Sequence, residues 1–216
     1  CTASTSRANS ATTGDNMTKK LGPWQQVSRQ VVYENPWLRL EHHEVKTPAG
    51  TDGIYGKICF QSVAVGVIPI DDEGNTFLVK QYRYTLEEDS WEIPEGGCPL
   101  GSSPLLTASR ELAEETGLSA KRWAKLMDLH TSNSVTDERA EVFLAMELVQ
   151  GDADLEASEH DIEVCRLPLG EAIAMALDGR ITDAISVSAL LKLQILLHSE
   201  AGDSRQVFTS LSEEFL

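Results

Sequence analysis

The sequence predicts an α+β fold built around a mixed or antiparallel sheet. Strand-like segments separated by turns fill residues 24–84 and return at 124–131 and 140–149. Helical patterns are scattered among and after them, first at 104–116 and then near the end of the chain. The 216 residues, 41% of them hydrophobic, are enough for one substantial core with an additional arm or subdomain.

The first half of the chain has the pattern of strands and turns. Apolar and polar residues partly alternate over 37–45, and residues 46–53 are dense in turn formers. The segment 62–70, SVAVGVIPI, has the length and β-branching of a buried strand. We also expect strands at 54–60 and 76–84, a hairpin loop at 71–75 and a long Gly/Pro loop at 90–104.

The helix at 104–116 has well-marked ends. Ser102 or Ser103 can cap its amino end, Pro104 suits its first turn, and Gly117 suits a left-handed exit. At about 100° per residue, one narrow apolar stripe should pack against the sheet. This stripe consists of Leu105, Ala108 and Leu112.

The second half continues the mixture of strands and helices. The polar segment 130–138 is expected to be a loop between two strands. An acidic loop is expected at 150–161, and helices at 170–179 and 181–199.

Composition and charge exclude several classes of function. Eighteen basic against 34 acidic residues give a net charge of −16, which disfavours binding to nucleic acid or to an anionic membrane. Four cysteines without C-x-x-C spacing are poor material for disulfides or zinc, and they fit a reducing, cytoplasmic location. No apolar run approaches the roughly 20 residues that a membrane helix needs.

Three carboxylates gather on the helix at 104–116. Glu111, Glu114 and Glu115 lie at i, i+3 and i+4, on a face that adjoins the apolar stripe. A solvated acidic face is one interpretation. The alternative is that a divalent cation, Mg²⁺ or Mn²⁺, offsets the repulsion, because such ions prefer clustered hard oxygen ligands. The position beside the core and the glycine-rich segment before the helix favour the metal.

The same region resembles the Nudix hydrolases. Their box reads Gly, five residues, Glu, seven residues, then Arg-Glu-aliphatic-x-Glu-Glu-x-Gly-aliphatic. Eight positions match in register, and Ser102 replaces the first Glu. The matching residues are Gly96, Arg110, Glu111, Leu112, Glu114, Glu115, Gly117 and Leu118.

The resemblance extends over about residues 24–198. KQYRY followed by WEIPEGG, WLRLEHHEVKTPAG and RITDAISVSALLKLQ are similar to segments of the ADP-ribose pyrophosphatase branch. This implies a Nudix fold, an α/β/α sandwich around a mixed sheet, with an N-terminal antiparallel β extension. It implies a β region for dimerisation and base binding at 17–60 and a Nudix domain at 61–200, followed by a tail at 201–216. Residues 1–16 are mostly small and polar, and we expect them to be a flexible leader, an extension or an expression remnant.

The resemblance also implies a metal site. In the family, a metal-bound water attacks a diphosphate that joins a nucleoside to another group. Glu111 and Glu115 are then the principal ligands, Glu114 shares a second ion, and the backbone carbonyl of Glu95 completes the set. Catalytic roles are implied for Glu115 and for Arg110. Because Ser102 removes the acid that braces Arg110 in the family, we expect a weakened scaffold with its metal ligands intact.

The resemblance also implies which residues bind the substrate. Glu92 is expected to contact a metal-bound water or the ribose, and Arg83 to bind a phosphate, although a surface ion pair is the alternative for Arg83. Gly96 belongs to the same substrate-binding segment. Trp37 and Tyr55 match the two aromatics that sandwich the base, often across a swapped dimer; core packing is the alternative for each.

The general base is expected on a late acidic loop. Glu159 is favoured and His160 is the alternative, since a one-residue shift in the match exchanges them. A solvated acidic loop competes with both assignments.

The sequence therefore predicts a Mg²⁺-dependent, homodimeric pyrophosphatase of nucleoside diphosphate sugars. ADP-ribose is the favoured substrate and would give AMP and ribose 5-phosphate. The alternatives are GDP-mannose, another sugar nucleotide or a dinucleotide as substrate, or a non-catalytic Nudix domain that senses a nucleotide.

Overall fold

The computed structural model describes residues 18–151 and 162–199. The chain divides into two compact units, which are described in turn. Unit 1 is Cys1–Gln61 with Ser132–Asp137, and unit 2 is Ser62–Thr131 with Glu138–Leu216. In the part of the chain that is described, no helix is long and apolar enough to cross a membrane.

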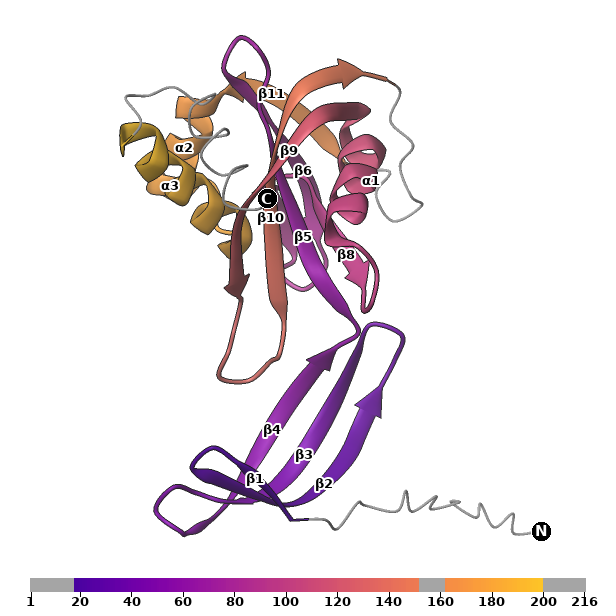
Figure 1. The fold of residues 1–216 in the computed structure, drawn as a ribbon, viewed down its shortest axis with the longest axis vertical. Helices are drawn as coiled ribbons and strands as arrows, with labels where there is room; N and C mark the ends of the chain where they lie inside the picture. Colours follow the sequence, from indigo (N-terminus) through magenta and orange to yellow (C-terminus); the bar gives the residue numbers. More distant parts are fainter. Residues whose placement is uncertain (1–17, 152–161, 200–216) are drawn as a thin grey trace, which may run out of the picture. The chain divides into compact units, whose positions relative to one another are not determined.

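Unit 1 is a four-stranded antiparallel sheet in the order β1-β2-β3-β4 (Figure 1). Its strands are β1 (Lys19–Leu21), β2 (Trp24–Glu34), β3 (Leu38–Lys46) and β4 (Asp52–Phe60). The predicted strands at 37–45 and 54–60 are therefore confirmed, as is the N-terminal antiparallel extension.

The polar segment Ser132–Asp137 of unit 1 is attached to β4. The amide of Ile58 donates to the carbonyl of Val135 at 2.9 Å, and the amide of Asp137 donates back to Ile58 at 3.1 Å. The carboxylate of Asp137 accepts from the amide of Phe60 at 2.9 Å and pairs with Lys57 at 2.7 Å. The expected loop is thus fixed along one strand by backbone and side-chain bonds.

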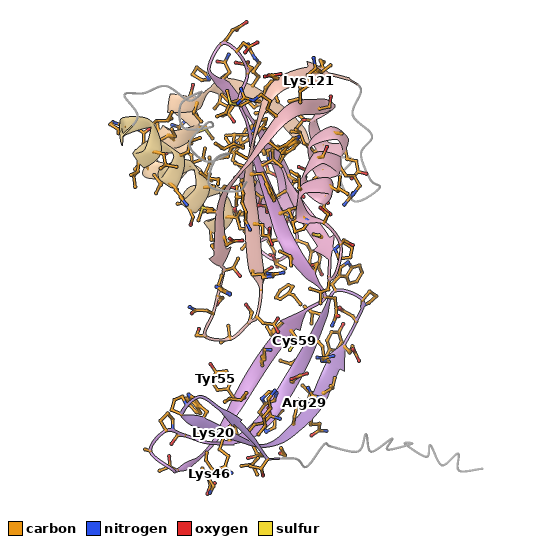
Figure 2. The ribbon with its side chains drawn as sticks, in the orientation of Figure 1. Lys20, Arg29, Lys46, Tyr55, Cys59 and Lys121 are labelled. Atoms are coloured by element: carbon orange, nitrogen blue, oxygen red, sulfur yellow. The ribbon has the colours of Figure 1, made fainter. Side chains whose placement is uncertain are left out.

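A charged cluster occupies one face of this sheet. Glu41, which is 3% exposed, accepts from Nε of Arg39 at 2.8 Å and lies 2.9 Å from Nε2 of His43. Arg29 adds a third partner at 3.6 Å (Figure 2 labels it on β2). Burial raises the pKa of Glu41, but the bonds from His43 and Arg39 and the charge of Arg29 outweigh it. The pKa of Glu41 therefore lies below its ordinary value of 4.5.

This cluster makes the stability of unit 1 depend on pH. Because its pKa is lowered on folding, Glu41 stabilises the folded state above pH 4.5, and this contribution disappears as pH falls through the lower folded pKa. We expect Glu41→Gln to lower the free energy of unfolding by about 2 kcal/mol at pH 7. The difference from the wild type should shrink below pH 4.5. Urea denaturation of both proteins between neutral and acid pH measures it, and parallel stability curves would contradict it.

Unit 2 contains two sheets. The order of the first is β8-β5-β10-β9, in which β5 and β10 run parallel and the other pairs are antiparallel, and the order of the second is β11-β6-β7. The predicted mixed sheet is confirmed. The strands are β5 (Ser62–Pro69), β6 (Asn75–Arg83), β7 (Glu88–Glu92), β8 (Glu95–Pro99), β9 (Leu118–His130), β10 (Arg139–Gln150) and β11 (Glu163–Pro168).

Helices cover both faces of the four-stranded sheet (Figure 1). On one face, α1 (Pro104–Thr116) buries Ala108 and Leu112 among the valines of β5. On the other face, α2 (Leu169–Asp178) and α3 (Ala184–Ser199) pack on a larger core centred on β10. Unit 2 is therefore an α/β/α sandwich.

The ends of α1 agree with the prediction. Ser103 caps its amino end by accepting from the amide of Leu106, and Gly117 leaves the helix with φ +70°. The stripe was predicted wrongly at one position, because Leu105 is 40% exposed. The buried face is rotated so that Thr107, 7% exposed, and two of the glutamates join it.

One predicted loop needs correction and another is confirmed. Residues 90–104 were expected to be a loop, but they contain the end of β7 and all of β8, where Gly96 pairs with Val65 of β5. Residues 71–75 do form a tight turn, closed by the amide of Asp71 on the carbonyl of Asn75 at 3.0 Å. An antiparallel bridge between Ile70 and Thr76 flanks this turn, so the predicted hairpin loop is confirmed, although β5 and β6 continue in different sheets.

Candidate active site

The glutamates of α1 lie at the edge of the core of unit 2. Glu111 is 5% exposed and Glu115 is 1% exposed, whereas the side chain of Glu114 is 24% exposed. Carboxylates are rarely buried this deeply unless they are paired or bind a cation. The solvated-face interpretation of this cluster is therefore wrong for Glu111 and Glu115.

Gly96 on β8 lies directly against Glu111. A Cβ at Gly96 would come 2.2 Å from the carboxyl carbon of Glu111. Any side chain at this position would displace the carboxylate, so glycine is required by the close approach of β8 to α1.

Glu95 connects β8 to Glu115. Its amide donates to Oε2 of Glu115 at 3.0 Å, and its own carboxylate, 13% exposed, accepts from Arg83 at 3.1 Å. Burial, together with the negative charges of Asp183, Glu92 and Glu115, raises the pKa of Glu95 well above its ordinary value, although Arg83 opposes the shift. Within the described residues, Oε2 of Glu95 is buried and has no hydrogen-bond partner.

Arg83 and Glu92 form a two-bond ion pair across β6 and β7. Nε of Arg83 donates to Oε1 of Glu92 at 2.8 Å, and Nη2 donates to Oε2. Burial lowers the pKa of Arg83, but the bonds to Glu92 outweigh it, so Arg83 is firmly protonated. A pocket of about 320 Å³ opens here and is lined by Arg83, Thr85, Ser90, Glu92, Glu95 and Asp183, among others. Arg83 is therefore in an ion pair, as the alternative interpretation expected, but its partner Glu92 is buried and the pair borders a pocket.

Arg110 lies between two glutamates of its own helix. It donates to Glu111 at 2.5 Å and also to Glu114, four residues further along. Ser102 lies in an exposed turn before the helix, where its amide donates to the carbonyl of Pro99 at 3.0 Å. Position 102, where the resemblance leads one to expect a glutamate, carries a serine in this chain. Arg110 is bound by Glu111 and Glu114.

The chemistry of this site fits a divalent cation. Carboxylates of Glu111, Glu114 and Glu115 and the backbone of Glu95 supply only hard oxygen donors, which Mg²⁺ prefers. Across residues 18–151 and 162–199, no three acidic, histidine or cysteine side chains are already arranged around one point. Arg110 binds Glu111 and Glu114, and the amide of Glu95 binds Oε2 of Glu115.

The two aromatic candidates lie on unit 1 and are well separated. Trp37 is 71% exposed, whereas Tyr55 is 36% exposed, donates to the carbonyl of Ser134 and meets Trp24 edge-on at 5.8 Å (Tyr55 is labelled in Figure 2). Leu38, next to Trp37, pairs with Phe60, five residues beyond Tyr55 along β4. At about 3.4 Å per residue, these five positions separate the backbones of Trp37 and Tyr55 by about 17 Å or more, so we do not expect their rings to face each other within one chain.

The two candidate bases cannot be placed. Glu159 and His160 lie outside the described residues.

Two comparisons with protein families cover most of the chain. The NUDIX domain model matches residues 61–189, which include all of β5 to β11, α1 and α2. The chain belongs to the Nudix family. A second model, the nucleoside diphosphate sugar hydrolase N-terminal domain, matches residues 24–58 of this Nudix protein.

Characterised proteins resemble this Nudix chain over most of their length. It is 33% identical over 171 residues to an ADP-ribose pyrophosphatase of Mycobacterium tuberculosis, covering 78% of this chain and 82% of that protein. It is 33% identical over 170 residues to an ADP-ribose pyrophosphatase of Bacillus subtilis, covering 78% and 91%. A GDP-mannose pyrophosphatase of Pectobacterium atrosepticum is 33% identical over 125 residues, covering 55% and 65%. The chain is a Nudix pyrophosphohydrolase.

A solved structure supports the Nudix fold. The crystal structure of an ADP compounds hydrolase superposes with a TM-score of 0.75 at 22% identity, covering 86% of this chain and 100% of that one. The predicted Nudix sandwich with its N-terminal extension is therefore confirmed.

Sequence reasoning missed two residues beside the Nudix box. Asp183 lines the pocket at Arg83, and Ser186, fully buried, accepts from the amide of Ile93 at 3.0 Å. The only local signal was an aspartate before an apolar helical run, which is typical of an N-cap. It indicates where a helix begins and carries no information about distant partners.

Restoring the missing acid of the Nudix box should release the metal ligands. In Ser102→Glu, we expect the new carboxylate to compete for Arg110 and so to free Glu111 and Glu114. The turnover number should rise by about twofold, or the melting temperature by about 2 °C, if one exposed ion pair of about 0.5 kcal/mol is gained. Ser102→Gln, with the same length and no charge, is the control. Unchanged rate and melting temperature in Ser102→Glu would count against this account of Arg110.

Proposed function

We propose that this Nudix enzyme hydrolyses the diphosphate bond of a nucleoside diphosphate sugar, with ADP-ribose as the favoured substrate, giving AMP and ribose 5-phosphate. The observation that carries the proposal is the buried pair Glu111 and Glu115, packed against Gly96 and the amide of Glu95. The ADP-ribose pyrophosphatases that resemble the chain over 78% of its length support the choice of substrate.

Nudix hydrolases use a divalent metal, and we infer Mg²⁺, with Mn²⁺ as a substitute. Glu111 and Glu115 would hold it, with Glu114 and the carbonyl of Glu95 as further donors. When bound, the metal supplies charge neutralisation for the diphosphate and acidifies a coordinated water. A diphosphate is otherwise inert because its negative charge repels nucleophiles.

Protein side chains provide the rest of the reaction. Arg83 keeps a positive charge in a pocket whose other charged groups are acidic, so it is suited to hold a phosphate oxygen. Glu92 fixes the guanidinium of Arg83 through two bonds and accepts from water or a ribose hydroxyl. Glu159, or His160 in its place, removes the proton from the attacking water.

Base binding is proposed to require two copies of the chain. Trp37 and Tyr55 are too far apart within one protomer to stack on the same base, so we infer a homodimer in which they come from different protomers. The apolar side chains that unit 1 leaves exposed, among them Val32, Trp37 and Ile54, are consistent with such an interface.

Cys59, Cys98 and Cys165 are free thiols, which fits a cytoplasmic location.

A substrate panel with and without EDTA tests this function. ADP-ribose, GDP-mannose, other sugar nucleotides and dinucleotides are incubated with the enzyme and Mg²⁺, and the products are separated by chromatography. We expect AMP and ribose 5-phosphate from ADP-ribose, and no turnover in EDTA. A higher kcat/KM for GDP-mannose would favour that substrate, as the Pectobacterium relative suggests. Nucleotide binding without cleavage of any compound would favour a sensing domain.

A further inference from the structure

The first turn of α3 holds the short connection between β7 and β8. The amide of Ile93 donates to Oγ of Ser186 at 3.0 Å, and both residues are 0% exposed. A buried amide that loses its acceptor carries a cost in free energy, so this bond fixes the position of the connection.

The next two residues of this connection are tied to two other elements. The carbonyl of Pro94 accepts from the amide of Val67 on β5 at 2.8 Å. The amide of Glu95 donates to Glu115 on α1 at 3.0 Å. Three consecutive residues are therefore bound to α3, β5 and α1, and α3 supplies the bond at Ile93.

Ser186 is itself held in place. Its amide donates to Oδ2 of Asp183 at 2.7 Å, which caps the amino end of α3. Packing around the bond is close, since a Cβ at Gly66 would come 2.9 Å from Ile93 and 3.3 Å from Ile185. The hydroxyl of Ser186 therefore occupies a fixed position relative to the connection.

The residues on either side of this connection belong to the proposed active site. Glu92 precedes Ile93 and binds Arg83, and Glu95 follows Pro94 and contacts Glu115. A displacement of about 1 Å at reacting groups can cost about 100-fold in rate. Loss of one of the three hydrogen bonds that hold this connection would therefore displace the carboxylates of both Glu92 and Glu95.

We propose that Ser186 is a positioning residue for diphosphate hydrolysis, which acts by holding the backbone between Glu92 and Glu95. The inference rests on the proposed function. A purely structural role for Ser186 would lower the melting temperature and leave the turnover of the folded enzyme unchanged, so kinetics separate the two roles.

The kinetic test compares three variants at a temperature well below their melting transitions. Ser186→Ala should lower kcat for ADP-ribose by at least about tenfold and change KM by less than about twofold. Ser186→Thr keeps a hydroxyl and should stay within about threefold of the wild type. Thr76→Val is the control for the removal of a buried hydroxyl. Thr76 is 0% exposed, and its hydroxyl has no hydrogen-bond partner among the described residues. A kcat for Ser186→Ala within twofold of the wild type, or equal losses in Ser186→Ala and Ser186→Thr, would overturn the proposal.

Amide exchange tests the attachment without substrate or metal. In Ser186→Ala, the amide of Ile93 should exchange at least about tenfold faster than in the wild type. The amide of Gly117, which donates to Ala113 at 2.9 Å, should be unchanged. Unchanged exchange at Ile93 overturns the proposal. If the wild type cleaves none of the substrates, the proposed function fails, and exchange at Ile93 still decides whether Ser186 holds the connection.

Discussion

Replacing Glu115 by glutamine is expected to reduce kcat by about 1,000-fold, or about 4 kcal/mol in activation free energy. Glu115 is 1% exposed and accepts the amide of Glu95 through Oε2. Glutamine keeps the shape and can still accept that amide, but it removes the negative charge that a dication needs. The fold should therefore persist while the reaction fails.

Steady-state kinetics and circular dichroism together measure this effect. Glu114→Gln is the matched control, since its side chain is 24% exposed and pairs with Arg110, and it should lose only about tenfold. A Glu115→Gln protein that stays within tenfold of the wild-type kcat would exclude Glu115 as a principal ligand.

Gly96→Ala should reduce kcat by about 100-fold with little loss of stability. The new methyl group would lie 2.2 Å from the carboxyl carbon of Glu111, so the carboxylate must move. The atoms displaced are the far end of a flexible side chain, which limits the cost to the fold. A metal ligand moved by about 1 Å or more is expected to lose a large share of its effect.

Gly97→Ala provides the control at the neighbouring position. A Cβ there would meet Ser62 at 3.5 Å, an ordinary van der Waals contact, so activity should stay within about twofold. Comparable rates for Gly96→Ala and the wild type would mean that the position of Glu111 does not matter for the reaction. Melting temperatures of both variants show whether any loss of rate comes from unfolding.

The sequence predicted the helix of the site well because its signals are local. Pro104 and Gly117 mark the ends of α1, and both ends agree with the structure. The spacing of Glu111 and Glu115 placed them on one face beside the apolar stripe. Leu105 was misplaced because the buried face is set by packing on β5, which no local pattern encodes.

The rest of the site depends on contacts between distant segments. Residues 90–104 looked like a loop because glycine and proline are frequent there, yet Gly96 pairs with Val65 and forms β8. The bond between Ser186 and Ile93 joins residues 93 positions apart. Neither pairing has a signature in a single sequence, since both arise from tertiary packing that overrides local propensity.

Calorimetric titration of Mg²⁺ into the enzyme, in the presence of the non-hydrolysable analogue α,β-methylene ADP-ribose, tests the central claim most directly. The claim is that the carboxylates of α1 bind dications beside a diphosphate. We expect Mg²⁺ uptake by the wild type and its loss in the double variant Glu111→Gln/Glu115→Gln. Absence of Mg²⁺ and Mn²⁺ uptake by the wild type with the analogue bound would contradict the claim.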